Sequence, residues 1–158
     1  SNYMRKIAGL LIGLTACVAL LSGCTKNTLS YTYNVETGDA VKVTIDRMEG
    51  YDMDSNNPFT VTLNDEDILT CQFLSEEGYE YYEGVLTEEN LDSQGGSIIE
   101  TGKKGTADYI FYTVGSGNAA EHDFFVKLND KTSVIIGSLS SEEEAKAGFD
   151  ALSFEIVK

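Results

Sequence analysis

The chain has 158 residues, 42% of them hydrophobic, and a formal net charge of −15 at pH 7. All 26 acidic residues but only 9 of the 11 basic ones follow Cys24, so the part of the chain after this cysteine carries a charge of −17. This surplus excludes a nucleic-acid-binding protein, because contact with a phosphate backbone needs clustered lysine and arginine. It also disfavours contact between the domain and anionic lipid headgroups.

The N-terminal segment has the pattern of an export signal. Arg5 and Lys6 give it a positive start, an apolar run follows at 7–21, and Leu21-Ser22-Gly23-Cys24 ends it. This pattern resembles the signal peptide of bacterial lipoproteins, whose lipobox ends in the cysteine that is lipidated and becomes the mature N-terminus. The apolar run has 15 residues, fewer than the ~20 that a membrane-spanning helix needs. The length therefore argues against an uncleaved anchor.

The lipoprotein resemblance implies a location and a domain organisation. Residues 1–23 are then the signal peptide, 24–30 a lipidated tether, and 31–158 a single globular domain. Fatty chains such as palmitate on Cys24 hold the protein on a bacterial membrane, facing outside the cytoplasm in the cell envelope. The tether reaches at most ~25 Å when extended, which keeps the domain close to that membrane.

The pattern after the tether predicts short antiparallel strands separated by turns. Apolar residues alternate through an opening hairpin with Thr37-Gly38-Asp39 as its turn, and through a second pair of strands around Asn64-Asp65-Glu66-Asp67. The residues that share a face in these four strands are Tyr31, Tyr33 and Val35; Val41, Val43 and Ile45; Phe59, Val61 and Leu63; and Leu69, Cys71 and Phe73. The first part of the domain is therefore expected to form a sheet.

The middle of the chain is expected to contain strands and loops but no helix. Residues 79–82 predict a strand in which Tyr82 points away from Tyr79 and Tyr81, so Tyr82 is interpreted as a surface aromatic that contacts a partner. Residues 87–104 are rich in glycine and predict a loop with one edge strand. Residues 108–114 are apolar on both faces and predict a central strand.

The end of the chain predicts a hairpin, a helix and a last strand. The hairpin turns at Asn129-Asp130-Lys131, and Ser141-Glu142-Glu143-Glu144 forms a capping box at the start of the helix. Ala145, Phe149 and Leu152 form the buried stripe of this helix, and a strand is favoured from Ser153. The hydrophobic pattern of this C-terminal third is similar to that of the Mog1/PsbP-like fold, which implies an antiparallel sheet with a helix on one face and carries no site residues over.

These elements together predict an α+β, β-rich fold. We expect an antiparallel sheet of about seven to nine short strands with one C-terminal helix. A β-sandwich with an appended helix is the alternative architecture.

Asp52, Asp54 and Asn56 place oxygen ligands at alternate positions before Pro58. A loop of this kind can wrap calcium, so these residues are the one predicted metal site and calcium the one predicted cofactor. The spacing is not that of an EF-hand, which needs glycine at position 57 and glutamate at position 63. A polar turn, in which aspartate and asparagine side chains bond their own backbone, explains the same residues.

No catalytic residue is assigned from the sequence. His122, flanked by Glu121 and Asp123, is expected in a loop before a strand, where the neighbouring carboxylates point away from it. Ser116 in Gly115-Ser116-Gly117 lacks the pattern of a nucleophile elbow. Cys71 is expected as a buried apolar residue and not as a reactive thiol.

The function predicted from the sequence is that of a lipid-anchored, noncatalytic binding or structural module of the cell envelope. Its partner is a protein, peptide or glycan, and nucleic acid is excluded. The alternative is a small envelope hydrolase. A cleft with converging titratable groups and a perturbed pKa favours the enzyme, whereas a shallow aromatic or acidic surface favours the module.

Overall fold

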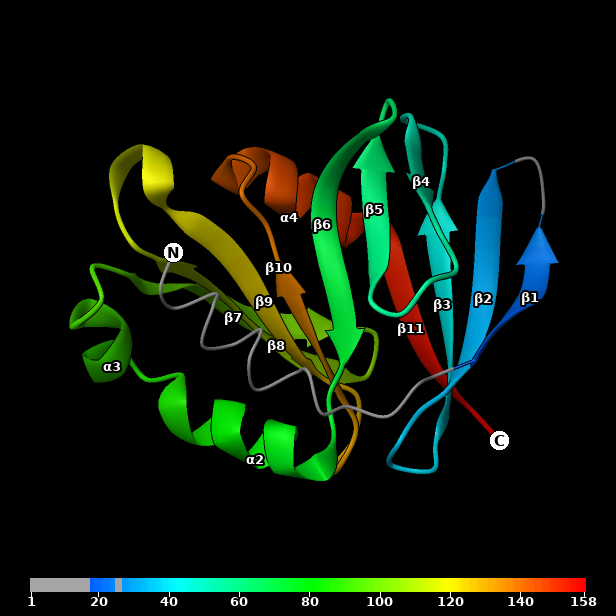
Figure 1. Ribbon diagram of the computed structural model, residues 1–158, viewed down its shortest axis with the longest axis horizontal. Helices are drawn as coiled ribbons and strands as arrows, with labels where there is room; N and C mark the ends of the chain where they lie inside the picture. The colour runs from blue at the N-terminus through cyan, green and yellow to red at the C-terminus, as the bar shows by residue number, and fades with distance from the viewer. Residues whose placement is uncertain (1–17, 25–26) are drawn as a thin grey trace.

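The computed structural model of the chain describes residues 18–24 and 27–158, and its strands form two antiparallel sheets (Figure 1). The short sheet has the order β1-β2-β3-β11 and comprises β1 (Val18–Cys24), β2 (Thr28–Asn34), β3 (Ala40–Asp46) and β11 (Leu152–Val157). The long sheet has the order β4-β5-β6-β10-β9-β8-β7 and comprises β4 (Tyr51–Met53), β5 (Phe59–Leu63), β6 (Glu66–Phe73), β7 (Ser97–Lys104), β8 (Ala107–Val114), β9 (Glu121–Lys127) and β10 (Ser133–Gly137). The α+β, β-rich antiparallel class is confirmed, although the strands form two sheets and not one.

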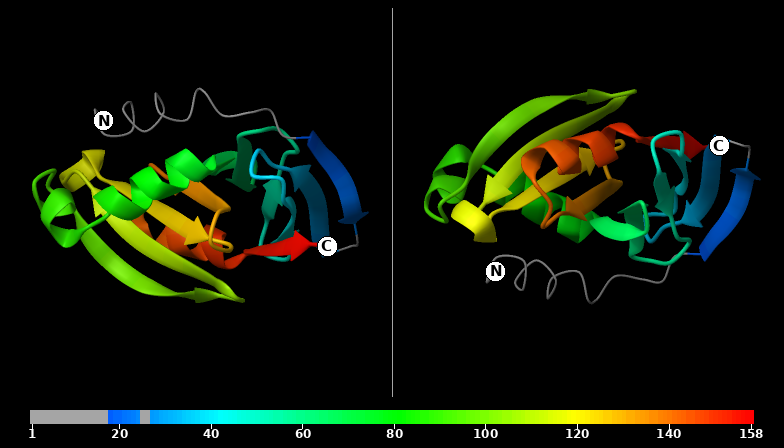
Figure 2. Two further views of the ribbon diagram at one scale, coloured as in Figure 1. Left: turned by 90° about the horizontal axis from the view of Figure 1, so that it is seen from below. Right: turned by 90° about the horizontal axis from the view of Figure 1, so that it is seen from above.

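The helices lie on opposite faces of the long sheet (Figure 2). The C-terminal helix, α4 (Glu142–Asp150), covers one face, while α2 (Glu76–Val85) and the short α3 (Glu88–Asp92) cover the other. A 3₁₀ turn, η1 (Gly117–Ala119), precedes β9. None of the helices in residues 18–24 and 27–158 is long and apolar enough to cross a lipid bilayer.

The predicted helix near the C-terminus forms as its capping box indicates. The Ser141 hydroxyl accepts a hydrogen bond from the backbone N–H of Glu144 at 3.1 Å, which satisfies one donor at the start of α4. Phe149 is fully buried and stacks on Phe124 of β9 with ring centroids 4.1 Å apart. A Cβ atom at Gly148 would lie 2.7 Å from Ile68 Cδ1, so this glycine permits the close approach of α4 to β6.

The expectation of a strand at 79–82 is wrong, because these residues belong to α2. The hydroxyl of Ser75 caps the helix by accepting from the N–H of Gly78 at 3.0 Å, and Glu76 and Glu77 suit the positive end of the helix dipole. Tyr79 and Tyr82, three residues apart, point to the same face of α2 and both contact Phe125 of β9. Aromatic residues favour strands in general, and here the cap and the tertiary contact override that preference.

The expectation for residues 87–104 is correct in part. Thr87 caps α3 with a hydrogen bond from the N–H of Asn90 at 3.2 Å, so a helix begins where a loop was expected. β7 then forms the edge of the long sheet, as predicted. The neighbouring strand, β8, is covered on both faces: Phe111 packs on the α4 side and Tyr112 on the α2 side.

β1 consists of residues that the lipoprotein resemblance assigns to the signal peptide, together with Cys24. It pairs antiparallel with β2, with Leu21 opposite Tyr31 and Cys24 opposite Leu29. Arg5, Lys6 and most of the apolar run lie outside the described residues. Cleavage before Cys24 would remove all of β1 except its last residue.

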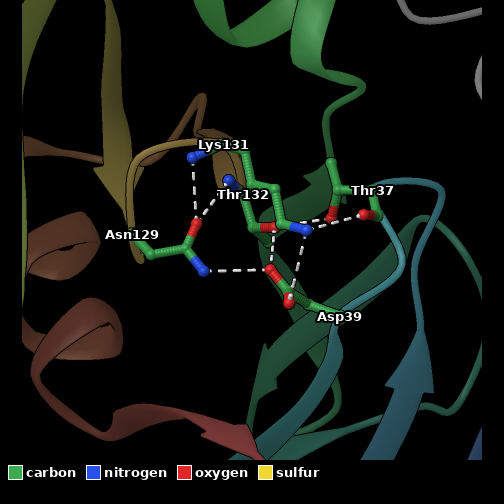
Figure 3. A network of polar contacts seen from close by, with 5 residues as sticks. All are labelled: Thr37, Asp39, Asn129, Lys131 and Thr132. Carbon is green, nitrogen blue, oxygen red and sulfur yellow. Dashed lines mark hydrogen bonds and ion pairs between the residues drawn. The ribbon is translucent and has the colours of Figure 1, made fainter.

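A polar network joins the turn between β2 and β3 to the turn between β9 and β10 (Figure 3). One carboxylate oxygen of Asp39 accepts from the Thr132 hydroxyl and, at 2.9 Å, from Asn129 Nδ2. Lys131 Nζ donates to the Thr37 carbonyl at 3.1 Å and lies 3.9 Å from the other Asp39 oxygen. Because these residues lie about 90 positions apart in the chain, the network fixes how the two sheets meet.

Candidate functional site

An open groove of about 410 Å³ lies between α4 and the neighbouring strands β7 and β8. Its floor is apolar, with the half-buried Ile99, the buried Phe111 and the small Ala147. Its rim carries charged side chains: Glu100, Glu142, Glu143, Lys146 and Asp150. A second hollow of about 290 Å³ shares Ala147 and Asp150 with the first and adds two more acidic residues, Asp46 and Glu49.

The groove is lined by four carboxylates, Glu100, Glu142, Glu143 and Asp150, and by one ammonium, Lys146, so its net charge is negative. Lys146 donates to Asp150 one helical turn away at 2.8 Å. Lys104 points to the Leu152 carbonyl at 2.8 Å and lies over the Phe149 ring, 4.6 Å from its centroid; burial lowers the pKa of its ammonium. Glu142 and Glu143 remain exposed in the first turn of α4. An apolar floor with an acidic rim suits a basic, partly apolar segment of a partner.

A buried pair of acidic side chains lies on the opposite face of the long sheet. Glu121 and Asp123 are two residues apart on β9, so they point to the same face, the face that α2 covers. Each is only 1% exposed. Tyr112 of β8 is paired with Asp123 in the strand register and is itself buried. Two carboxyl groups and a phenol therefore lie within an aromatic layer.

The Asp123 carboxyl is incompletely satisfied. Its Oδ1 accepts from the backbone N–H of Ser138 at 3.1 Å, whereas its Oδ2 is buried and has no hydrogen-bond partner among the described residues. Burial, followed by the negative charge of Glu121, raises the pKa of Asp123 well above its usual range. A carboxyl group with a raised pKa can hold a proton at neutral pH and donate it, as a general acid does.

Sequence reasoning named Glu121 and Asp123 only as neighbours of His122 and missed their burial. The sequence predicted a loop at these positions, and charged side chains carry no local signal that they are buried. His122 lies within β9 and not in a loop, which corrects the expected position. Its Nδ1 is 2.8 Å from the Ser140 carbonyl, on the side of the strand away from the two carboxyls.

Ser116 does not join this arrangement. It precedes η1 and is exposed, in a loop held by the positive φ angles of Gly115 and Gly117. The triplet Gly115-Ser116-Gly117 thus lies in a loop between β8 and β9.

The predicted calcium residues occupy β4 and the turn that follows it. Asp52 Oδ1 lies 3.6 Å from Arg47 Nε. Asp54 Oδ1 accepts from the backbone N–H groups of Asn56 at 3.1 Å and Thr60 at 3.2 Å, which is the local bonding of a polar turn. Within residues 18–24 and 27–158, no three histidine, cysteine or acidic side chains converge as a metal site. Calcium binding at these residues stays a prediction, and the turn accounts for the contacts of Asp54.

Tyr82 is fully buried, so the expectation that it forms a surface contact is wrong. Its neighbour Tyr81 is 44% exposed and takes the outward position on α2. Helical geometry reverses the faces that a strand would have produced.

The two cysteines after the apolar run differ in what the structure says about them. Cys71 is fully buried, as predicted, and burial raises the pKa of its thiol well above the usual value. Cys24, the expected lipidation site, ends β1, and its lipidation stays a prediction.

Comparison with known proteins adds no relative. No family model, curated protein or solved structure matches this chain. The lipoprotein and Mog1/PsbP-like resemblances therefore rest on the sequence patterns alone.

Proposed function

We propose that this chain is a lipid-anchored, noncatalytic binding module of the bacterial cell envelope. In this proposal fatty chains on Cys24 hold the domain outside the cytoplasm, and the groove along α4 receives a basic segment of an envelope protein or peptide. The observation that carries the binding role is the apolar floor of this groove beneath a rim of exposed carboxylates. The sequence Leu21-Ser22-Gly23-Cys24 supports the anchor.

The charge of the domain supports a basic partner. A surface that carries −17 after Cys24 repels acidic partners and attracts basic ones before contact. The apolar floor then adds burial of nonpolar area, which stabilises a complex that exposed ion pairs alone hold only weakly. Membrane attachment raises the local concentration of a partner that shares the same membrane.

The anchor is tested by labelling with palmitate in a bacterial host. We expect the wild-type chain to incorporate labelled palmitate and to begin at Cys24, and Cys24→Ala to lose both the label and the cleavage. Cys71→Ala is the matched control, because that thiol is buried in the domain. Native protein that keeps its first 23 residues, or that takes up no label, contradicts the anchor.

The groove is tested with a synthetic peptide of alternating lysine and leucine. Replacing Glu142 and Glu143 by glutamine should weaken peptide binding about fivefold, since exposed ion pairs contribute roughly 0.2–1 kcal/mol each. Glu88→Gln with Glu89→Gln is the matched control, because these residues also lie in the first turn of a helix and are exposed. Equal weakening by both pairs would show that only net charge matters and would remove the groove from the proposal.

A second function, that of a small hydrolase, is favoured by one observation. Asp123, whose pKa is raised by burial, lies two residues from a second buried carboxyl group on the same face of β9, and acid–base hydrolysis uses a pair of carboxyl groups. The test is hydrolysis of chromogenic glycoside or ester substrates. Activity that Asp123→Asn abolishes, and that Asp67→Asn on the exposed part of β6 retains, would replace the binding proposal with an enzymatic one. Equal turnover by both variants would remove Asp123 from any such chemistry.

A further inference from the structure

The pairing of β1 with β2 bears directly on the proposed cleavage. β1 covers the outer edge of β2 from Asn34, opposite Val18, to Leu29, opposite Cys24. If the signal peptide is removed before Cys24, six of the seven β1 residues leave with it. The outer edge of β2 then presents backbone N–H and C=O groups that no longer have a strand beside them.

We propose that β2 of the cleaved protein accepts an extended segment of another polypeptide in the place that β1 occupies. This inference rests on the proposed function, because the edge opens only when the signal peptide is cleaved. The incoming segment would run antiparallel to β2 and add a strand to the short sheet, a mode of recognition in which main-chain hydrogen bonds supply the affinity.

The contacts of β2 with the rest of the domain indicate that this edge stays formed without β1. All seven residues of β2 pair with β3 without a shift in register. Leu29 and Tyr33 are buried in the core, and the ring of Tyr33 stacks on Phe59 of β5 with centroids 5.4 Å apart. The hydroxyls of Ser30 and Thr44 lie 2.7 Å apart across the two strands. β3 is held in turn by β11 on its other side.

The chemistry of β1 indicates what kind of segment fits. Its sequence, Val-Ala-Leu-Leu-Ser-Gly-Cys, has no charged residue and contains mainly small and aliphatic side chains. The surplus of acidic residues disfavours an acidic segment, and it also disfavours a second copy of this chain, since each copy carries −17. We therefore assign the edge to an uncharged or basic, aliphatic segment of a different envelope protein.

The position of the edge suits a partner at the membrane. β2 begins at Thr28, four residues after the cysteine that carries the lipid in the proposed function. An antiparallel segment paired in the register of the six removed residues has its C-terminal end opposite Ser30, next to the retained Cys24 and on the anchored side of the domain. The expected segment is thus one that runs toward the membrane as it pairs.

The test uses the acetylated and amidated peptide Val-Ala-Leu-Leu-Ser-Gly as the probe, which corresponds to the six β1 residues that cleavage removes, with the cleaved lipoprotein in detergent. Hydrogen–deuterium exchange of residues 28–34 is measured with and without the peptide. We expect fast exchange at the outward-facing amides of the cleaved protein, and at least tenfold slower exchange, about 1.4 kcal/mol of added protection, when the peptide is bound. The same peptide with alternate N-methylated amides is the control, since it keeps the side chains but cannot donate to a strand.

Three results would overturn the inference. Unchanged exchange with the peptide, or equal protection by the N-methylated peptide, shows that the edge does not accept a strand. If the cleaved protein exchanges slowly without peptide and is dimeric by light scattering, the edge of β2 is occupied by a second copy of the chain. Native protein that retains residues 1–23 contradicts the anchor instead, and then β1 itself protects β2 in the absence of any peptide.

Discussion

Two carboxyl groups in different surroundings, Asp39 at the joint between the sheets and Asp123 on the α2 face of the long sheet, show how differently this domain accommodates acidic side chains. Asp39 joins the two sheets and accepts hydrogen bonds from Thr132 and Asn129. Asp123 lies on the α2 face of the long sheet, where its Oδ2 is buried without a hydrogen-bond partner among the described residues. A carboxylate that accepts hydrogen bonds stabilises the fold, whereas a buried carboxylate with an oxygen that accepts none destabilises it.

The pKa values of the two groups move in opposite directions for these reasons. The hydrogen bond from Thr132, then that from Asn129, and the nearby charge of Lys131 lower the pKa of Asp39. Burial and the charge of Glu121 raise the pKa of Asp123. Asp39 therefore contributes to the joint between the sheets, whereas burial of the Asp123 carboxyl opposes folding at neutral pH.

The largest effect is expected at the joint between the sheets. Asp39→Ala removes the acceptor for two side chains and the partner of Lys131, so the free energy of unfolding should fall by about 2 kcal/mol, as for the loss of hydrogen bonds to a charged group. Urea denaturation measures the change. Asp130→Ala, an exposed residue in the neighbouring turn, should change the unfolding free energy by less than about 0.5 kcal/mol; equal losses would remove the special role of Asp39.

The next effect has the opposite sign. Asp123→Asn replaces a carboxyl group that at pH 7 must either take up a proton on folding or be buried ionised, both of which oppose folding. A neutral amide carries neither cost, so the free energy of unfolding at pH 7 should rise by about 1 kcal/mol. Thermal unfolding monitored by circular dichroism measures this gain, and Asp67→Asn on the exposed part of β6 should leave the melting temperature unchanged. A large loss of stability on Asp123→Asn would show that this carboxylate is structural and would break the contrast with Asp39.

The pH dependence of stability should separate the two groups further. Because the pKa of Asp39 is lowered from 3.8, its contribution is present above pH 3.8 and is lost as the pH falls through the folded-state pKa. Because the pKa of Asp123 is raised, the folded state binds its proton more tightly, and this contribution is present below pH 3.8 and lost as the pH rises through the folded-state pKa. Urea denaturation midpoints are measured from about pH 2 to 8. The loss of stability at low pH should be absent in Asp39→Asn, and the loss at higher pH should be absent in Asp123→Asn.

The smallest effect is expected at Asp54, whose carboxylate resembles that of Asp39 in accepting two hydrogen bonds. Its donors are the N–H groups of Asn56 and Thr60, so Asp54 Oδ1 is already engaged by the turn. We therefore expect millimolar calcium to shift the melting temperature by less than about 1 °C. If these residues did bind calcium, a concentration 100-fold above the dissociation constant would raise the free energy of unfolding by about 2.7 kcal/mol. A clear rise in calcium that Asp54→Asn abolishes would establish the metal site.

The parts of the fold that were predicted correctly depend on local chemistry. The turn at Thr37-Gly38-Asp39 needs a backbone that glycine adopts readily, and Gly38 has a φ angle of 96°. α4 begins where Ser141 caps it. The helix at Tyr79 and Tyr82 was missed because its tyrosines pack against Phe125, a residue more than forty positions away. An alternation of aromatic and acidic residues fits a strand equally well until that contact is known.

By itself, the sequence determined the features that arise between near neighbours: the hairpins, the cap of α4, the acidity of the domain and the resemblance of residues 1–24 to a lipoprotein signal. Only the tertiary structure decided which carboxyl groups are buried, which tyrosine on α2 faces solvent, and that Asp39 joins two sheets. Burial and long-range hydrogen bonds are set by which faces meet after the chain has folded. The roles of Asp39 and Asp123 therefore differ although both are aspartates on or beside a strand.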